Sequence, residues 1–314
     1  MKISVRLEGG LGDCLLGNRF VSAIKEKYPE SSITAYIDSE GKTFQKQSLS
    51  YLYPHVYSDI KVIPSKKYKE LWVDSQFGQE KHYGALENVP EEIRIEMESY
   101  DRFYDLHIDS MKWVSYDFDW YRYFKFFPKA AQNKPPPEEE YILCHLVSSS
   151  SKEHVMSKGY IEDLITELKT TDKKIYIIST PETNDYYSEF QNDKQITIVN
   201  DSIENICDLI SGAKVFVATD SGFRYIAYGY SVPTVTFSKQ CFAPFEVLKS
   251  HYARWLMYPE LTFPLSFDYK YISIIAKKIL WNKGYSLAPT VNNFDAEMVN
   301  RKYSINLEKS ILNE

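Results

Sequence analysis

The sequence predicts an α/β protein made of two doubly wound domains, each a parallel sheet covered by helices. Short runs rich in Ile, Val and Leu alternate with segments of helical apolar spacing along most of the 314 residues. A run of three prolines and three glutamates interrupts this alternation near the middle of the chain. The length also fits two domains, at roughly 100–200 residues per domain.

The composition is that of an ordinary globular protein. Hydrophobic residues make up 44% and charged residues 25%, and 43 acidic against 37 basic residues give a net charge of −6. This balance argues against a strongly basic nucleic-acid coat protein. The 4 cysteines are widely spaced and lack metal-ligand spacing, so we expect reduced thiols and neither metal nor cofactor. The chain has no signal-peptide pattern and no membrane-length apolar stretch, which predicts a cytoplasmic protein without a membrane span.

The first half of the chain opens with a strand–helix–strand pattern. Residues 2–7 alternate as a strand, a glycine-rich loop follows, and apolar residues from Leu15 to Tyr28 recur at helical spacing until Pro29. The next strand spans residues 32–37. Shorter elements are expected beyond it, namely strands at 59–63 and 105–108 and loops with short helices across 68–102.

The segment Pro135–Glu140 predicts a linker between the domains. Three prolines favour a stiff extended chain, and three glutamates keep it solvated. The alternative is a surface loop inside one domain. We therefore divide the chain into an N-terminal domain (1–134), the linker (135–140), a C-terminal domain (141–265) and C-terminal helices (266–314) that are expected to pack back toward the N-terminal domain.

The second half repeats the alternation of strands and helices. A strictly alternating pattern favours a parallel sheet with helices on both faces. Strands are expected at 141–146, 174–179, 195–199, 215–218 and 233–237, and helices at 161–168, 203–213, 223–229, 272–281 and near the C-terminus.

The loop after the first strand is the first candidate site. Gly10 and Gly12 allow the backbone to approach a ligand closely, and the following helix directs its positive end at the same space. Asp13 stands at the start of that helix. Two interpretations remain open: Asp13 only caps the helix, or it is a general base that the helix dipole keeps ionised.

The loop after strand 215–218 is the second candidate. Thr219, Asp220, Ser221 and Gly222 combine hydroxyls with a turn and a helix N-terminus, which suits a diphosphate or a sugar. Asp220 is better suited to sugar hydroxyls than to phosphate. A helix start without any ligand is the alternative.

The third candidate follows strand 141–146. Ser148 and Ser149 belong to a serine run, and Lys158 stands just before a helix start. Serine hydroxyls and a lysine ammonium can hold phosphate oxygens. The alternative is a plain surface loop.

Together these loops resemble those of GT-B glycosyltransferases of the heptosyltransferase type, glycosyltransferase family 9. The resemblance lies in Gly10-Leu11-Gly12-Asp13 with its helix, in Asp220-Ser221-Gly222, and in the strand Val232–Val235. It implies a GT-B fold, in which two Rossmann-like doubly wound domains enclose a cleft, with acceptor binding in the N-terminal domain and donor binding in the C-terminal one. It also implies roles: Asp13 as catalytic base, Asp220, Ser221 and Gly222 at the donor, Lys158 at its phosphates, and Glu182 near the nucleoside.

One position departs from this family. The family usually has a histidine three residues beyond the glycine of the second-domain loop, and here Tyr225 takes that place beside the cation Arg224. Either side chain could bind the donor. The change argues against ADP-heptose as the donor but leaves sugar transfer itself in place.

The resemblance implies an inverting, metal-independent glycosyltransferase. It would move a sugar from a nucleotide-sugar donor to the hydroxyl of a saccharide or glycoconjugate acceptor, without a cofactor. One alternative is a phage-type glycosyltransferase that modifies a hydroxylated DNA base, for which the basic runs Lys61–Lys69 and Arg122–Lys129 would contact the duplex. Another is a nucleotide-sugar epimerase or binding protein of the same fold.

Overall fold

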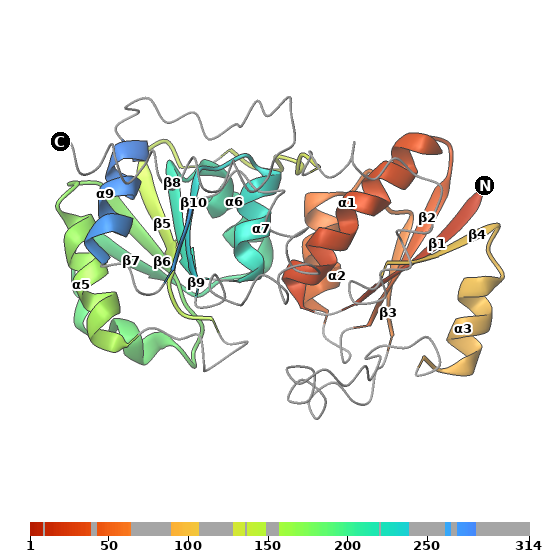
Figure 1. The fold of residues 1–314 in the computed structure, drawn as a ribbon, viewed down its shortest axis with the longest axis horizontal. Coiled ribbons are helices and arrows are strands. Elements are labelled where there is room, and N and C mark those ends of the chain that lie inside the picture. The colour runs from red at the N-terminus through yellow and green to blue at the C-terminus, as the bar shows by residue number, and fades with distance from the viewer. Residues whose placement is uncertain are drawn as a thin grey trace.

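The structure is a computed structural model with two α/β lobes that lie side by side (Figure 1). It describes residues 1–8, 10–38, 43–63, 89–106, 128–135, 137–148, 157–219, 221–238, 261–264 and 269–280. Each lobe contains one parallel sheet, so the predicted pair of Rossmann-like domains is confirmed.

The N-terminal sheet has the strand order β3-β2-β1-β4, and all its described pairings are parallel. Alternate residues of the buried strand β1 face opposite sides: Ile3, Val5 and Leu7 pack with α1 and α2, and the Ser4 hydroxyl donates to the Met97 carbonyl of α3 at 2.6 Å. The elements are β1 (Lys2–Glu8), α1 (Leu11–Lys27), β2 (Ser32–Asp38), α2 (Phe44–Leu52), β3 (Asp59–Ile63), α3 (Glu91–Glu98) and β4 (Arg102–Asp105).

The second sheet has the order β10-β9-β8-β5-β6-β7 and is also parallel. Helices α6 and α7 cover the face toward the N-terminal domain, and α5 and α9 cover the other (Figure 1). The elements are β5 (Tyr141–His145), α5 (Lys158–Lys169), β6 (Lys174–Ile178), a 3₁₀ helix η5 (Asn184–Phe190), β7 (Ile196–Val199), α6 (Ile203–Gly212), β8 (Val215–Thr219), α7 (Gly222–Gly229), β9 (Thr234–Ser238), β10 (Leu261–Pro264) and α9 (Tyr269–Leu280).

Two sequence-based expectations need correction. The strand expected at 105–108 is β4 at Arg102–Asp105, because its pairing with β1 runs from Ile3↔Arg102 to Arg6↔Asp105. Helix α9 packs against α5 rather than toward the N-terminal domain, since its buried residues Ala276 and Leu280 join the apolar cluster under α5. Residues 281–314, where a last helix is expected, lie outside the described part of the chain.

A buried ion pair joins β1 to β4 near their carboxyl ends. Arg6 is 0% exposed, and its Nη1 lies 3.3 Å from Asp105 Oδ2 and 3.4 Å from Oδ1. The two residues face each other directly in the strand register. A buried charge needs a partner, so this pair fixes β4 beside β1.

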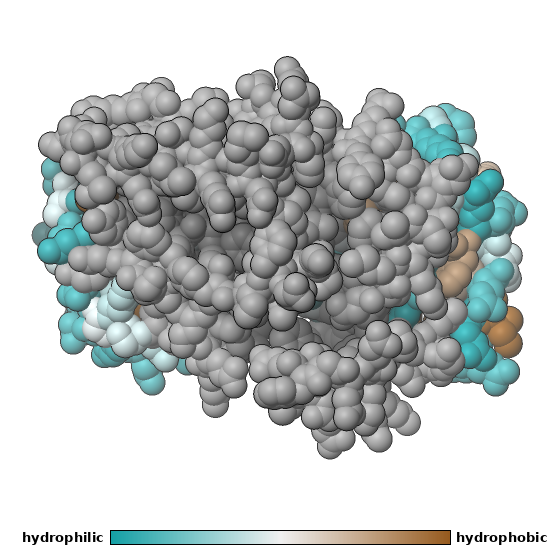
Figure 2. All heavy atoms as spheres, viewed as in Figure 1, coloured by the Kyte–Doolittle hydropathy of each residue, from teal (hydrophilic) through white to brown (hydrophobic). Residues whose placement is uncertain are grey.

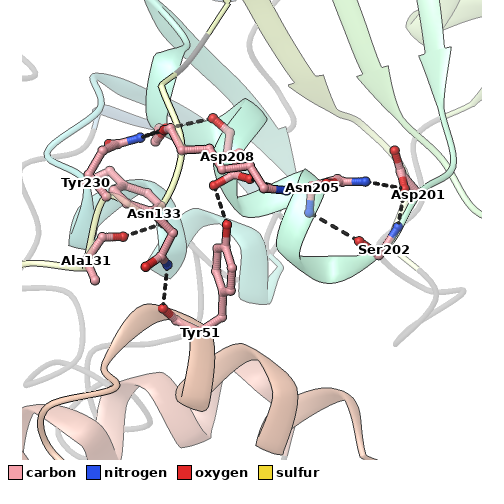
Figure 3. A network of polar contacts seen from close by, with 11 residues as sticks. Tyr51, Ala131, Asn133, Asp201, Ser202, Asn205, Asp208 and Tyr230 are labelled. Carbon is pink, nitrogen blue, oxygen red and sulfur yellow. Dashed lines mark hydrogen bonds and ion pairs between the residues drawn. The ribbon is translucent and has the colours of Figure 1, made fainter.

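The chain that leads from the first domain to the second is bonded to both. The backbone N–H of Ala130 donates to the Gly229 carbonyl at 2.8 Å, and that of Ala131 donates to the Leu52 carbonyl at 2.8 Å. Nearby, the Tyr51 hydroxyl of α2 reaches across to α6 and donates to Asp208 Oδ1 at 2.7 Å (Figure 3). Burial raises the pKa of Tyr51 well above its usual value, so this hydroxyl keeps its proton.

The described surface is largely polar. Figure 2 shows hydrophilic side chains at both outer ends of the molecule, with a small hydrophobic area among them at the α3 end. Among the residues that the structure describes, the large apolar side chains that are exposed are Met1, Phe44 and Ile95. Within the described residues, we find no helix with the length and apolar character needed to cross a membrane.

Candidate active site

Both sheets reverse their strand order beside their first strand. β1 lies between β2 and β4, and β5 lies between β6 and β8. In open parallel sheets, ligands bind outside the carboxyl ends of the strands at this point. The loops after β1, β5 and β8 are therefore the places where a ligand is expected, and they are the three loops singled out from the sequence.

Asp13 lies in the first turn of α1, and its carboxylate folds back toward the start of the helix. Gly10 is the N-cap residue, and its backbone N–H donates to Asp13 Oδ2 at 3.0 Å. Asp13 is thus the third residue of the helix rather than its cap. The positive end of the helix favours the ionised carboxylate, which is the form that a general base needs.

The loop after β8 places Ser221 and Gly222 at the N-terminus of α7. Thr219 is buried at the end of β8, Ser221 is the N-cap residue, and Gly222 begins the helix. The Ser221 hydroxyl lies 2.9 Å from His145 Nδ1, at the end of β5. Asp220 lies outside the described residues.

The N-termini of α1 and α7 meet across the domain boundary. A Cβ placed on Gly222 would lie 2.8 Å from the Leu11 Cβ and 3.0 Å from the Gly12 backbone nitrogen. A Cβ placed on Gly12 would lie 2.8 Å from the Tyr225 ring. Only residues without side chains allow this approach, which brings the predicted acceptor and donor loops together.

Arg224 and Tyr225, in the first turn of α7, bind each other. Arg224 Nη2 donates to the Tyr225 hydroxyl at 2.6 Å, and the guanidinium carbon lies 4.7 Å from the ring centroid of Tyr225. Both side chains are 6% exposed. A cation therefore lies next to the α7 N-terminus, held by the tyrosine that replaces the expected histidine.

The third loop is only partly described. Ser148 is half-buried after β5, and Ser149 lies outside the described residues. Lys158 is the first residue of α5, and its Nζ lies 3.2 Å from Ser188 Oγ and 3.7 Å from Glu162 Oε1. Its ammonium thus faces η5 and its own helix.

Glu182 follows β6 and is exposed. A hydrogen bond from the Thr180 side chain lowers the pKa of the Glu182 carboxyl, which keeps it ionised. A separate hollow of about 490 Å³ lies at the domain boundary between α2 and α6. Its lining contains none of the predicted site residues and consists of Thr43, Lys46, Gln47, Ser50, Tyr51 and Glu204.

His145 is the site residue that sequence reasoning missed. It ends the apolar strand β5 at the point where the strand order reverses, and it is 5% exposed. The only feature of the sequence that could have indicated His145 is a polar residue at the end of a buried strand. Its hydrogen-bond partner, Ser221, is distant in the sequence, so the pair could not be seen there. Burial lowers the pKa of its imidazole to about 4, so the ring is neutral near pH 7.

Comparison with solved structures places this arrangement among known folds. The chain matches E. coli ADP-heptose LPS heptosyltransferase II with a TM-score of 0.61 at 11% identity, over 90% of this chain and 99% of that one. The chain has a GT-B fold. It also matches E. coli heptosyltransferase WaaC bound to ADP-2-deoxy-2-fluoro heptose (TM-score 0.53, 12% identity, 90% of this chain and 98% of that one).

A third match is a glycosyl transferase of family 9 from Veillonella parvula DSM 2008, with a TM-score of 0.52 and 13% identity over 98% of this chain and 97% of that one. No protein-family model matches the sequence, and no curated protein shows significant sequence similarity to it. The GT-B fold predicted from the loops is therefore confirmed by structure, at identities that carry no residue roles with them.

Proposed function

We propose that this protein is a glycosyltransferase that moves a sugar from a nucleotide-sugar donor to an acceptor hydroxyl. The observation that carries the proposal is the meeting of two helix N-termini across the domain boundary. One carries the carboxylate Asp13, and the other is the anion-attracting start of α7 with Arg224 beside it. A base and an anion site on opposite walls are what glycosyl transfer from a nucleoside diphosphate requires.

In the proposed reaction the donor binds to the second domain. Its diphosphate lies at the start of α7, and Thr219, Asp220, Ser221 and Gly222 surround the phosphates and sugar. The nucleoside lies toward Glu182, after β6. Arg224 supplies positive charge next to the start of α7, and Lys158 is the cation proposed for the phosphates from the loop after β5. Donor groups at the departing diphosphate stabilise its negative charge in the transition state.

The acceptor lies on the N-terminal side, near Gly10 and Gly12. Asp13 takes the proton of the acceptor hydroxyl as its oxygen attacks the anomeric carbon, from the face opposite the leaving diphosphate. The anomeric configuration inverts, and no step needs a metal ion. The acceptor is the hydroxyl of a saccharide or glycoconjugate.

DNA as the acceptor has less support. Lys61, from the first basic run, forms an ion pair with Glu96 of α3. The hydrogen bond between these two side chains is the main cause of the raised pKa of Lys61. Lys66, Lys67, Lys69, Arg122 and Lys125 lie outside the described residues.

The test is a panel of ADP-, UDP-, GDP-, CDP- and dTDP-sugars, including ADP-heptose, assayed with and without acceptors. We expect release of nucleoside diphosphate that depends on a saccharide acceptor and persists in EDTA, with an inverted anomeric centre in the product by NMR. Sugar interconversion without acceptor would identify an epimerase, and transfer only to DNA with hydroxymethylated bases would identify the DNA-modifying alternative. Either result contradicts the proposal.

A further inference from the structure

The first turns of α1 and α7 interlock where the two domains meet. Gly222 and Tyr225 lie one turn apart on α7 and therefore share one face of that helix. The first two residues of α1 pack against this face: Leu11 lies over Gly222, and Gly12 lies against the ring of Tyr225. Asp13, the proposed base, is the next residue of α1, so its position depends on how this interlock is filled.

The ring of Tyr225 fills the space beside Gly12. A Cβ placed on Gly12 would lie 2.8 Å from Cε2 and 3.0 Å from Cδ2 of this ring, so a methyl group would not fit there unless the ring moved. The contact is therefore made by one edge of the ring against the backbone of Gly12. A smaller side chain in place of Tyr225 would leave a gap beside the start of α1, and partial collapse into this gap would shift Asp13.

The Tyr225 ring is held in place by its neighbours. It is 6% exposed and belongs to an apolar cluster that extends from α1 into α7. The ring of Tyr228, one turn further along α7, meets it edge-to-face with the centroids 5.7 Å apart. Arg224 Nη2 donates a hydrogen bond to the Tyr225 hydroxyl at 2.6 Å. A ring that is buried and bonded in this way has one fixed position, so its free edge can set the position of the chain that packs against it.

We propose that Tyr225 is a positioning residue whose ring sets the place of Asp13 relative to the start of α7. This inference rests on the proposed function, in which Asp13 is the base and the diphosphate lies at α7. The acceptor oxygen attacks the anomeric carbon only if the base and the leaving group lie on opposite sides of that carbon at a suitable separation. The Tyr225 ring sets this separation, because its edge lies between the backbone of α7 and that of Gly12.

The ring and the hydroxyl of Tyr225 contact different parts of the molecule, so their roles can be separated. The ring edge contacts Gly12 of the N-terminal domain, whereas the hydroxyl is bonded to Arg224 of its own helix. Tyr225→Phe and Tyr225→Leu both remove the hydroxyl, and only the leucine variant also removes the ring. A difference between these two variants therefore reports the ring alone.

The test measures kcat at saturating donor and acceptor, with the substrate pair that turns over fastest in the nucleotide-sugar panel. We expect Tyr225→Phe to stay within about twofold of wild type, and Tyr225→Leu to fall roughly 10- to 100-fold below Tyr225→Phe, the cost of a misplacement on the order of 1 Å. Both variants should bind the nucleoside diphosphate product with the same affinity in calorimetry, because both lack the same hydroxyl. Equal kcat values in the two variants would overturn the inference.

Tyr36→Phe and Tyr36→Leu are the matched controls. Tyr36 is 1% exposed, its hydroxyl is bonded to that of Tyr100, and the two rings meet edge-to-face. It packs with Met97 of α3, on the face of the first sheet that is turned away from the second domain. We expect Tyr36→Leu to lower the melting temperature about as much as Tyr225→Leu does, with kcat unchanged. If Tyr225→Leu also lost only stability, its ring would be merely structural and the inference would fail.

Gly12→Ala tests the same contact from the other side. In wild type the added methyl group meets Cε2 of the Tyr225 ring, and leucine has no atom at that place. We therefore expect Gly12→Ala/Tyr225→Leu to retain at least about threefold more activity than the product of the two single losses predicts. Losses that simply multiply would show that the Tyr225 ring and Gly12 act independently, against the inference.

A measurement that needs no turnover separates this inference from the proposed function. Hydrogen exchange of the backbone amides at the start of α1 should be faster in Tyr225→Leu than in Tyr225→Phe, because the ring edge covers the backbone of Gly12. Equal exchange in the two variants overturns the inference, whatever the protein transfers. A wild-type protein that releases no nucleoside diphosphate with any acceptor overturns the proposed function instead, and the exchange rates still report the contact of the ring.

Discussion

Gly12 and Gly222 face each other where the two domains meet, with only 3.0 Å between the Gly12 backbone nitrogen and the place where a Gly222 Cβ would stand. This contact joins the start of α1, which carries Asp13, to the start of α7, where we propose that the diphosphate binds. The spacing of the two candidate loops therefore depends on the absence of two side chains, and this can be tested directly.

Gly222→Ala should push α7 away from α1, since the added methyl meets backbone as well as the Leu11 side chain. We expect a loss of roughly 1–3 kcal/mol in the free energy of unfolding by urea, the range for overpacking, with a larger fractional loss of turnover. Gly159→Ala in α5 is the control, because its Cβ has nothing within 4 Å. It should leave turnover unchanged and stabilise the helix by up to about 1 kcal/mol.

Asp13→Asn should lower turnover by roughly 10²–10⁴-fold, the usual contribution of a general base. The side chain keeps its size and an oxygen for the Gly10 N–H, so nucleoside diphosphate affinity should stay near that of wild type. Glu204→Gln is the matched control, since it removes an acid from the first turn of α6. Full activity in folded Asp13→Asn would remove Asp13 from the catalytic role.

The buried His145 makes stability depend on pH. Burial lowers the pKa of its imidazole from the ordinary 6.5 to about 4, so the unfolded chain binds its proton first. The contribution is fully present above pH 6.5 and is lost as the pH falls toward 4, by on the order of 3 kcal/mol. Urea unfolding of wild type and His145→Asn between pH 4 and 7 measures it as the difference between the two curves. Parallel curves would contradict the assignment.

Tyr51→Phe should loosen the contact between the domains. It removes the hydrogen bond from α2 to the Asp208 carboxylate of α6, which is worth about 1–2 kcal/mol for a partly exposed charged acceptor. We expect faster proteolysis across residues 128–140 together with lower stability. Tyr141→Phe removes a hydrogen bond to the Leu209 carbonyl within the second domain and should lower stability without faster cleavage there. Equal cleavage rates in both variants would contradict a role of Tyr51 between the domains.

Asp105→Ala should cost about 3–5 kcal/mol of unfolding free energy, because it removes the carboxylate that faces the fully buried Arg6 across the strand pair. Replacing both residues with apolar ones, as in Arg6→Met/Asp105→Leu, should cost less than the single change. Thermal and urea unfolding measure the stability of both variants. An Asp105→Ala variant as stable as wild type would show that the ion pair does not anchor β4.

The buried strands were the most predictable elements, because parallel strands covered on both faces are continuous apolar runs. β1, β2, β3 and β5 through β9 lie within about two residues of their expected ends. Helix α2 escaped prediction since Gln45 and Ser48 occupy buried positions and break its apolar period. Helix α3 was expected only as one of several short helices across 68–102, and its bounds escaped prediction because Met97 is its buried residue. The short strand β10 offers only four residues.

The candidate site was predictable to the level of its loops and no further. Glycines and hydroxyls after strands located both helix starts. The sequence does not show that Asp13 is the third residue of α1, or that the Lys158 side chain points toward Ser188. Both depend on local geometry, which the order of the amino acids does not reveal directly. The bond between His145 and Ser221 needs β5 and α7 to be packed together, which only the tertiary fold brings about.

The backbone bonds of Ala130 and Ala131 have a mechanical consequence. Adjacent residues attach to opposite halves, one to Gly229 and the next to Leu52. A rotation of one domain relative to the other that preserves both hydrogen bonds must have its axis through the dipeptide Ala130-Ala131. In such a rotation, the displacement of a residue grows with its distance from the axis. The displacement is therefore greatest for α3 and α5, at the two outer ends of the molecule (Figure 1), and small for the chain beside Ala130.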